Sequence, residues 1–464
     1  MTDSDTAGTL KMLRGVPDME TARKWLAERQ IEDLECMTSD QAGVARGKLM
    51  PAEKFFNTPD MNIPSSVLTQ TITGDYALDN ETFQHDPVDS DLVLKPDLSS
   101  LTVVPWASDP TGQIIHDAFY KNGDPVDISP RNVLKKVLAL YADLGLRPII
   151  APELEFYLVK PNTDPDDPLE PPVGRSGRSE SGRQLYSISA VNEFDDLFDD
   201  IYDYSEAQGL AIDTLVHEEG AGQMEINLRH GDPLELADQV FLFKRTIREA
   251  ALRHSMYATF MAKPIAGEPA SSMHIHQSIV GLESGRNEFS GKDGEPTDLF
   301  YNFIAGQNAF LPNVMCILAP YVNSYRRLAR NTEVAVNVNW DYDNRTVGLR
   351  VPMAGAQSRR VENRIPSSDA NPYLSIAASL ACGLIGIQKK MDPPPPLSGS
   401  GEGLPYGVPR GLLEAVDLFE KCPELIDILG ARFVATYCAI KLEEYETFMA
   451  VISPWEREFL LLNV

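Results

Sequence analysis

Several apolar segments of the chain carry acidic or imidazole side chains at every second position. Glu153 and Glu155 lie within the run 149–159, which is otherwise apolar, and His274 and His276 alternate with apolar residues. Side chains two positions apart on a β-strand point to the same face of the sheet. The pattern therefore predicts buried strands on which the members of each pair converge on one face.

Helices are predicted where apolar residues recur at three- and four-residue spacing. Ser129 is expected to cap a helix that has Pro130 at its first position, and Asp232-Pro233 starts a longer helix that runs to about Met256. Stretches 161–184 and 392–403 are rich in proline, glycine and charge, which is typical of exposed loops.

The chain is expected to form two domains that meet at a polar turn. Residues 1–124 carry short strand signals, such as 68–72 and 101–104, and one short helix at 21–29. In residues 125–464 strands and helices alternate without a strict βαβ rhythm.

Composition narrows the possible partners. With 43% hydrophobic and 23% charged residues the chain resembles ordinary soluble proteins, and its 41 basic against 68 acidic residues give a net charge of −27. This charge argues against a nucleic-acid or anionic-membrane partner. No signal-like or membrane-length apolar run is present, so a cytoplasmic protein is expected. The five cysteines, odd in number and widely spaced, indicate neither a disulfide framework nor a zinc site.

The acidic and imidazole residues are candidate metal ligands. They are Glu153, Glu155, Glu218, Glu225, His274, His276 and Glu362. Burying so many carboxylates is too costly unless cations neutralise them, and hard divalent ions prefer carboxylate oxygens with an occasional imidazole. One pair alone would fit a strand whose polar face meets solvent. Four such segments in one chain favour a site for two metal ions.

Arginines gather near the last of these acids. They are Arg327, Arg345, Arg350, Arg359, Arg360 and Arg364. Guanidinium groups beside divalent metals are what phosphoryl transfer requires, because both neutralise charge on phosphate oxygens. The chain has no G-x-x-x-x-G-K-[ST] loop, so any ATP must be held by a fold without that phosphate-binding loop.

These segments, in this order, closely resemble the glutamine synthetase family over nearly the whole chain. The matching motifs are DLVLKPD at 91–97, PELEF at 152–156, AGQME at 221–225, FMAKP at 260–264, MHIH at 273–276, NSYRR at 323–327, NR at 344–345, RVP at 350–352 and ANPYL at 370–374. The resemblance implies an α+β fold. A small N-terminal β-grasp-like domain (1–124) would precede a large catalytic domain (125–464) built on a curved antiparallel sheet flanked by helices.

The resemblance also implies a role for each candidate residue. One Mg²⁺ or Mn²⁺ would be held by Glu155, Glu218 and Glu225, and the other by Glu153, His274 and Glu362. ATP would contact His276, Arg350 and Arg360, while glutamate and its γ-phosphate would contact Arg327, Arg345 and Arg364. Glu333 matches a flap residue that takes a proton from the attacking amine. The family forms double hexameric rings whose active sites lie between subunits, so a homo-oligomer is expected.

Two departures from the family pattern concern which amine the protein uses as a substrate. The Asp-Gly-Ser-Ser-Ile stretch of the ammonium site has no clean match near Ile63, and the glycine-rich run before His274 is replaced by 268–272. The segment 63–72 offers Ile63, Val67, Leu68 and Ile72 beside the hydroxyls of Ser65, Ser66 and Thr69. This lining predicts a glutamate ligase for an alkylamine or polyamine. The alternatives are a glutamine synthetase that uses ammonia and, less favoured because the metal-ligand positions are intact, an inactive homologue.

Overall fold

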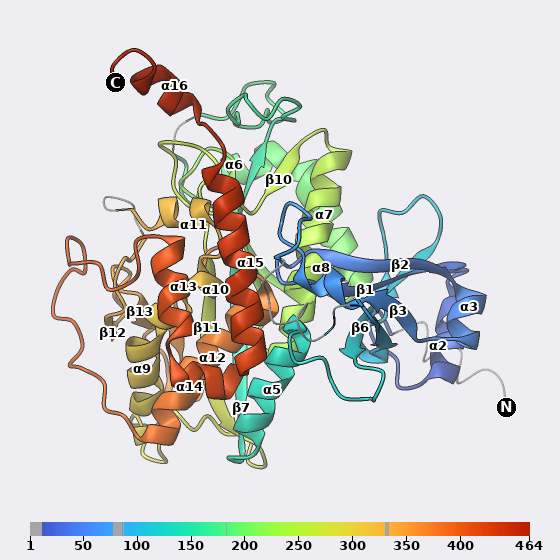
Figure 1. The fold of residues 1–464 in the computed structure, drawn as a ribbon, viewed down its shortest axis with the longest axis horizontal. Helices are drawn as coiled ribbons and strands as arrows, with labels where there is room; N and C mark the ends of the chain where they lie inside the picture. The colour runs from blue at the N-terminus through green and yellow to red at the C-terminus, as the bar shows by residue number, and fades with distance from the viewer. Residues whose placement is uncertain (1–11, 78–85, 87, 182, 330–333) are drawn as a thin grey trace.

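A small N-terminal sheet and a larger C-terminal sheet organise the chain (Figure 1). The computed structural model describes residues 12–77, 86, 88–181, 183–329 and 334–464. Within these residues no helix is both long and apolar enough to span a membrane. The two sheets and their helices confirm the α+β architecture predicted from the sequence.

The small sheet has the strand order β2-β1-β6-β4-β3, and β5 pairs with β6. The strands are β1 (Asp33–Ser39), β2 (Ala45–Pro51), β3 (Met61–Pro64), β4 (Asp91–Pro96), β5 (Thr102–Val103) and β6 (Thr111–Phe119). Strands β1 and β6 are parallel and the other pairs are antiparallel. Helices α2 (Met19–Glu28) and α3 (Ala52–Asn57) belong to the same part of the chain.

One predicted strand of the small domain is wrong. Residues 68–72 do not form a strand, because η1 (Ser65–Thr69) is a 3₁₀ helix. The hydroxyl of Thr69 donates to the carbonyl of Ser66 at 2.9 Å, a local bond that competes with strand pairing. The last strand of the small sheet ends at Phe119 and the first helix of the large part begins at Pro130, so the domain boundary at residue 124 stays a prediction.

The large sheet has the strand order β12-β13-β14-β11-β7-β9-β8, and β10 pairs with β7. The strands are β7 (Leu146–Val159), β8 (Ile212–His217), β9 (Gln223–Leu228), β10 (Tyr257–Thr259), β11 (Met273–Gly281), β12 (Trp340–Tyr342), β13 (Leu349–Val351) and β14 (Val361–Asn363). All pairs are antiparallel except β12 with β13.

The helices of this part of the chain continue to its C-terminal end. They are α5 (Pro130–Ala142), α6 (Ile188–Val191), α7 (Asp195–Gln208), α8 (Pro233–Arg253), α9 (Asp298–Phe310), α10 (Met315–Leu318), α11 (Val322–Arg327), α12 (Pro372–Lys389), α13 (Leu412–Glu420), α14 (Pro423–Leu429), α15 (Ala431–Met449) and α16 (Pro454–Leu460). Short 3₁₀ helices lie at η2 (Leu98–Ser100), η3 (Asn192–Phe194), η4 (Leu311–Val314) and η5 (Ala356–Ser358).

The two helices predicted from capping signals form where expected. Helix α8 begins at Pro233, and the side chain of Asp232 accepts hydrogen bonds from the amides of Leu234 and Glu235 at 3.0 and 3.2 Å. Helix α5 begins at Pro130, but the Ser129 side chain does not cap it, so that part of the prediction is wrong.

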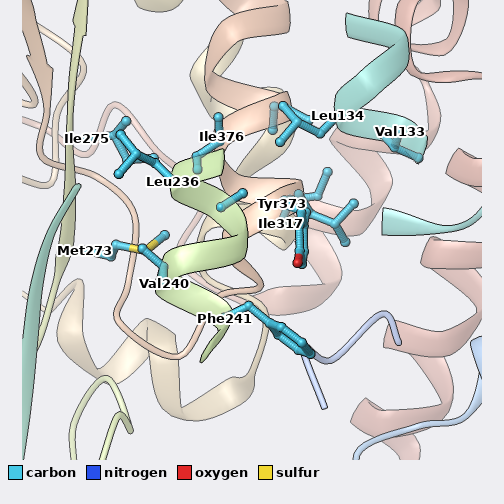
Figure 2. Close-up of a cluster of buried hydrophobic side chains, with 14 of the residues drawn as sticks. Val133, Leu134, Leu236, Val240, Phe241, Met273, Ile275, Ile317, Tyr373 and Ile376 are labelled. Atoms are coloured by element: carbon cyan, nitrogen blue, oxygen red, sulfur yellow. The ribbon is translucent and has the colours of Figure 1, made fainter. Parts of the chain in front are cut away.

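Buried apolar side chains join the large sheet to its helices. Figure 2 shows Met273 and Ile275 of β11 pointing toward Leu236 and Val240 of α8, with Ile376 of α12 close by. These residues belong to the hydrophobic core. Because successive side chains of a strand point to opposite faces, this packing leaves the histidines of β11 on the face away from the helices.

Candidate active site

The acids and imidazoles predicted as metal ligands lie on one face of the large sheet. Strand pairing places Glu155 opposite Glu225, Glu153 opposite His274, and His276 opposite Glu362. Directly opposed residues of antiparallel strands project to the same face. Glu218 follows directly after the last residue of β8. The apolar residues between these positions enter the core, so strand alternation brings together side chains that are far apart in sequence.

Three of these residues form a compact group of possible metal ligands. Ligand atoms of Glu153, His276 and Glu362 lie within 4.8 Å of one another, and His276 Nε2 is 2.7 Å from Glu153 Oε1. Burial by itself would raise the pKa of Glu362, but Arg364, the two histidines and Arg350 lower it to about 2. Glu362 is therefore a carboxylate at neutral pH.

The other carboxylates crowd one another without enough positive charge. Burial and the charge of Glu218 raise the pKa of Glu155 to about 8, and burial together with Glu153, Glu155 and Glu218 raises that of Glu225 to about 9. Burial and Glu153 also raise the pKa of Glu218. A divalent cation among these oxygens would relieve the repulsion, and carboxylate oxygens are the ligands that Mg²⁺ and Mn²⁺ prefer.

The two histidines of β11 differ in their neighbours. The resemblance pairs His274 with Glu153 and Glu362, whereas in this structure His276 lies in that group and His274 Nε2 is 3.4 Å from Glu155 Oε1. Burial and nearby arginines hold the pKa of His274 well below its ordinary value, so its imidazole is neutral. A neutral imidazole is the form that binds a metal.

Arginines line the edge of this face. Arg350 donates to Glu362 at 2.8 Å, Arg364 also contacts Glu362, and Arg360 Nε donates to His276 Nδ1 at 3.0 Å. Arg359, which the sequence places in the same cluster, bonds instead to Ser290 Oγ at 2.8 Å in another loop. Arg350 and Arg364 therefore contact an acid of this face and Arg360 contacts a histidine, whereas Arg359 has a structural role.

Arg327 and Arg345 occupy different environments. Arg327 is fully buried, and its guanidinium donates to Ser272 Oγ at 2.7 Å and to the carbonyl of Ile365 at 2.7 Å. Arg345 is exposed, and its charge lowers the pKa of Glu218 against the effect of burial. Glu333 lies outside the residues that the structure describes, so its role stays a prediction.

A cavity of about 350 Å³ opens beside the acids. Predicted residues Glu155, Glu218, His274, Arg327 and Arg364 line it. Four charged residues that the sequence did not single out line it as well: Arg183, Glu219, Lys263 and Glu268. Glu219 directly follows the predicted ligand Glu218. Glu268 belongs to the segment 268–272, which replaces the glycine-rich run of the family. Neither position in the sequence predicts that its side chain reaches this cavity.

A second cavity of about 690 Å³ continues along the same strands. Its lining includes Arg147 and Ile149 of β7 and Ser278 and Val280 of β11. These positions are separated by even numbers of residues from Glu153 and His276, so they share the face of the acids. This face of the sheet thus borders two cavities, one beside the acids and one further along β7 and β11.

The predicted lining of the small domain is largely wrong. Ile63 and Leu68 are buried in the hydrophobic core. Ser65 and Ser66 are buried too, and their hydroxyls donate to Asp86 and Asp89 at 3.0 and 2.9 Å. Of the four apolar residues proposed for this lining, only Ile72 is exposed, so this segment of a single chain offers little apolar surface to an amine.

The chain is similar to one protein family and to several of its curated members. The glutamine synthetase catalytic domain model matches residues 127–460. The γ-glutamylputrescine synthetase PuuA of Escherichia coli is 35% identical over 93% of this chain and 92% of its own length. The glutamate–isopropylamine ligase of a Pseudomonas species is 34% identical over 94% of this chain and 96% of its own length. A glutamine synthetase of Pyrococcus abyssi is 33% identical over 84% and 87%.

Solved structures with the same fold cover almost the whole chain. The structure of apo GmaS superposes with a TM-score of 0.81 at 30% identity and covers 96% of this chain and 100% of its own. A GmaS complex with ADP gives a TM-score of 0.80 at 29% identity, with the same coverage.

Proposed function

Because this chain belongs to the glutamine synthetase family, and is therefore a carbon–nitrogen ligase, we propose that it joins the γ-carboxylate of glutamate to an alkylamine or polyamine at the expense of ATP, through γ-glutamyl phosphate. The observation that carries this proposal is the single sheet face on which five carboxylates and two imidazoles meet, with arginines at its edge and a cavity beside it.

The acids of this face would hold two divalent cations. We assign Glu155, Glu218 and Glu225 to one ion, and Glu362 and Glu153 with an imidazole of β11 to the other. Such ions, when bound, screen phosphate oxygens and align them for transfer. The raised pKa values of Glu155 and Glu225 fit this role, because both burial and the repulsion of neighbouring carboxylates raise them, and a bound cation would offset both effects.

The arginines would act on the phosphoryl group and on glutamate. Arg350 and Arg360 stand beside Glu362 and His276, where they can neutralise the phosphates of ATP. Arg364 lines the cavity next to the acids and can bind the γ-carboxylate. Arg345 and the buried Arg327 stay proposed glutamate contacts, and Glu333 the proposed proton acceptor for the attacking amine.

The second cavity is the proposed site for the adenosine part of ATP. It lies along β7 and β11, next to the position where His276 would meet the phosphates. Its mixed apolar and polar lining, with Ile149, Val280 and Ser278, is typical of sites for a planar base. We therefore place the adenosine of ATP there and glutamate in the first cavity.

The amine is proposed from the relatives rather than from the small domain. The two curated amine ligases align with 93% and 94% of this chain, and the Pyrococcus glutamine synthetase with 84%. A small alkylamine or a polyamine is therefore favoured over ammonia. Ammonia remains the second candidate because the archaeal enzyme is nearly as similar in sequence.

Turnover with a panel of amines tests the proposal. Purified protein would be incubated with ATP, glutamate, Mg²⁺ and ammonium, methylamine, isopropylamine, ethanolamine or putrescine, and both phosphate and the γ-glutamyl amide would be measured. We expect amide formation that depends on glutamate and amine, with a higher kcat/KM for an organic amine than for ammonium. Ammonium as the best substrate would identify a glutamine synthetase, and no glutamate-dependent turnover with any amine would refute ligase activity.

A further inference from the structure

A third cavity lies at the β12 edge of the large sheet. It has a volume of about 830 Å³ and, among the residues that the structure describes, shares no lining residue with the two cavities at the candidate active site. Strand β12, helix α9 and the end of α12 with the chain that follows it form its walls. In Figure 1 this last segment, coloured orange, runs along the left edge beside β12 and α9. The proposed ligase reaction does not use this cavity.

One wall of this cavity is aromatic. Tyr301 of α9 and Trp340 and Tyr342 of β12 line it. The ring centroid of Trp340 lies 6.2 Å from that of Tyr301 and 5.6 Å from that of Tyr342, in both cases in edge-to-face contact. Trp340 is buried, whereas Tyr342 is 39% exposed. Aromatic rings that border a cavity attract organic cations, because the π-electrons give each ring face a partial negative charge.

A second wall consists of four consecutive prolines, residues 393–396. The indole Nε1 of Trp340 donates to the carbonyl of Pro394 at 2.7 Å, and the amide of Leu397 donates to the carbonyl of Trp340 at 2.9 Å. These two bonds hold the proline segment against β12. Proline has no backbone N–H, so this wall can offer carbonyl acceptors but no backbone donors to a ligand.

Two aspartates of the lining carry negative charge. Asp298 lies in the first turn of α9, and Asp392 directly precedes the prolines. Within the described part of the chain, neither carboxylate has a Lys, Arg or His side chain within ion-pair distance. Lys390 is the one basic residue among the described residues of the lining, so two carboxylates stand against one ammonium group. The cavity therefore combines aromatic rings, carbonyl acceptors and a net negative charge.

We infer that this cavity is a binding site for a diamine, separate from the proposed active site. A diamine has an ammonium group for each aspartate and a methylene chain that packs on the aromatic rings and the prolines. The carboxylates and the proline carbonyls accept hydrogen bonds from its N–H groups. An anion fits poorly, because it meets two carboxylates and a row of carbonyl oxygens.

Calorimetric titration with putrescine and with 1,4-butanediol, in the absence of ATP and glutamate, tests this site. The diol has the same carbon chain as putrescine but no charge, so we expect putrescine to bind and the diol not to bind. Asp298→Asn combined with Asp392→Asn should weaken putrescine binding at this site by roughly tenfold, because both carboxylate charges are lost. Tyr342→Leu keeps an apolar side chain but removes the ring, and should weaken putrescine binding by roughly threefold.

Asp195→Asn combined with Asp196→Asn is the matched control. It removes the same charge from two exposed aspartates in the first turn of α7. Putrescine binding should keep its native affinity in this variant. Unchanged putrescine binding in the Asp298/Asp392 variant or in Tyr342→Leu, an equal loss in the α7 control, or equal binding of the diol would overturn the inference.

Putrescine that also binds at the proposed active site does not obscure this result. Such binding involves neither Asp298 nor Asp392, so it persists in the variant that lacks both carboxylates and is seen there alone. Putrescine binding that depends on the two aspartates, in a protein that forms no γ-glutamyl amide, would support this site and refute the ligase. Amide formation in a protein whose putrescine binding does not depend on them would refute this site and support the ligase.

Discussion

Side chains of the same type reach opposite protonation states on this sheet face. The pKa of Glu362 falls to about 2 because arginines and histidines surround it, although burial acts in the other direction. The pKa of Glu225 rises to about 9 because burial and three neighbouring carboxylates disfavour its charge. The position of each acid relative to the arginines therefore decides whether it needs a bound cation to become ionised.

Glu225→Gln tests whether the carboxyl of Glu225 is protonated without a bound cation. A carboxyl whose pKa is raised on folding keeps a proton that the unfolded chain releases, so its contribution to stability falls as pH rises from 4.5 to about 9. Without metal, the melting temperature of the native protein should therefore decline over this range more than that of Glu225→Gln. Mg²⁺ should raise the melting temperature of the native protein more than that of the variant, which keeps the second proposed ion site.

Activity completes this test. We expect Glu225→Gln to reduce phosphate release by at least roughly a hundredfold, because a metal ligand is lost while the fold is kept. Near-native turnover, or a Mg²⁺ response equal to that of the native protein, would contradict the assignment of Glu225 as a ligand.

Glu333→Ala addresses the proposed proton acceptor. A carboxylate that receives a proton from the amine is needed for amide formation but not for moving the phosphoryl group. We expect amide formation to fall by roughly a hundredfold, with a much smaller effect on glutamate-dependent ATP cleavage in the absence of amine. Equal losses in both assays would indicate a structural role.

At the scale of elements, strand alternation orients the side chains of the site, and a buried ion-pair network joins the small sheet to the helices of the large part. Arg131 of α5 is at the centre of these buried ion pairs. Its guanidinium is buried and donates to Asp238 of α8 at 2.9 Å, to Asp97 at 2.7 Å and to Asp117 of β6 at 2.5 Å. Tyr373 of α12 donates to the same Asp238 at 2.7 Å. One side chain thus connects the small sheet with three helices of the large part.

Arg131→Met should destabilise the protein strongly. Removing the cation leaves the buried Asp238 with only the more distant guanidinium of Arg14 at 4.0 Å, and breaking a buried pair of this kind costs about 3–5 kcal/mol. Lys135→Met is the matched control, because Lys135 lies one turn further along α5 and contacts Asp117 with a side chain that is 37% exposed. It should cost about 1 kcal/mol or less. Similar losses in urea unfolding of the two variants would contradict the role given to Arg131.

At the scale of the whole molecule, an apolar C-terminal segment stands away from the body. Helix α16 extends from the end of α15 at the upper left of Figure 1. Ile452, Trp455 and Leu462 are 61%, 61% and 91% exposed, and Val451 and Phe459 are exposed as well. Exposed apolar clusters of this kind mark surfaces that a protein partner covers, which agrees with the homo-oligomer expected from the resemblance.

Sedimentation velocity should therefore show a particle many times heavier than the 51.3 kDa chain. Deleting residues 451–464, which removes the exposed apolar side chains of this segment, should shift the distribution toward smaller species. If the active sites lie between subunits, as the resemblance implies, turnover should fall with the loss of large particles. A native chain that sediments as a monomer and is fully active would refute this expectation.

Local sequence patterns determined the family and most of the regular structure. The period-two alternation in β7 and β11 set which face each acid and histidine occupies, and Asp232-Pro233 set the start of α8. These features depend on residues close in sequence, since strand alternation and helix capping are local. The motifs around them were enough to identify the family and the seven candidate ligands on the sheet.

Tertiary structure decided which of those side chains become neighbours. It placed His276 beside Glu153 and Glu362, paired Arg359 with Ser290 of another loop, and buried Ile63 and Leu68 in the hydrophobic core. It also brought Lys263 and Glu268 to the cavity, in a loop held by Tyr157 and Gln223. A sequence pattern specifies the direction of a side chain relative to its own backbone. Its partners depend on strand register and on long-range packing, which arise only when distant segments pair.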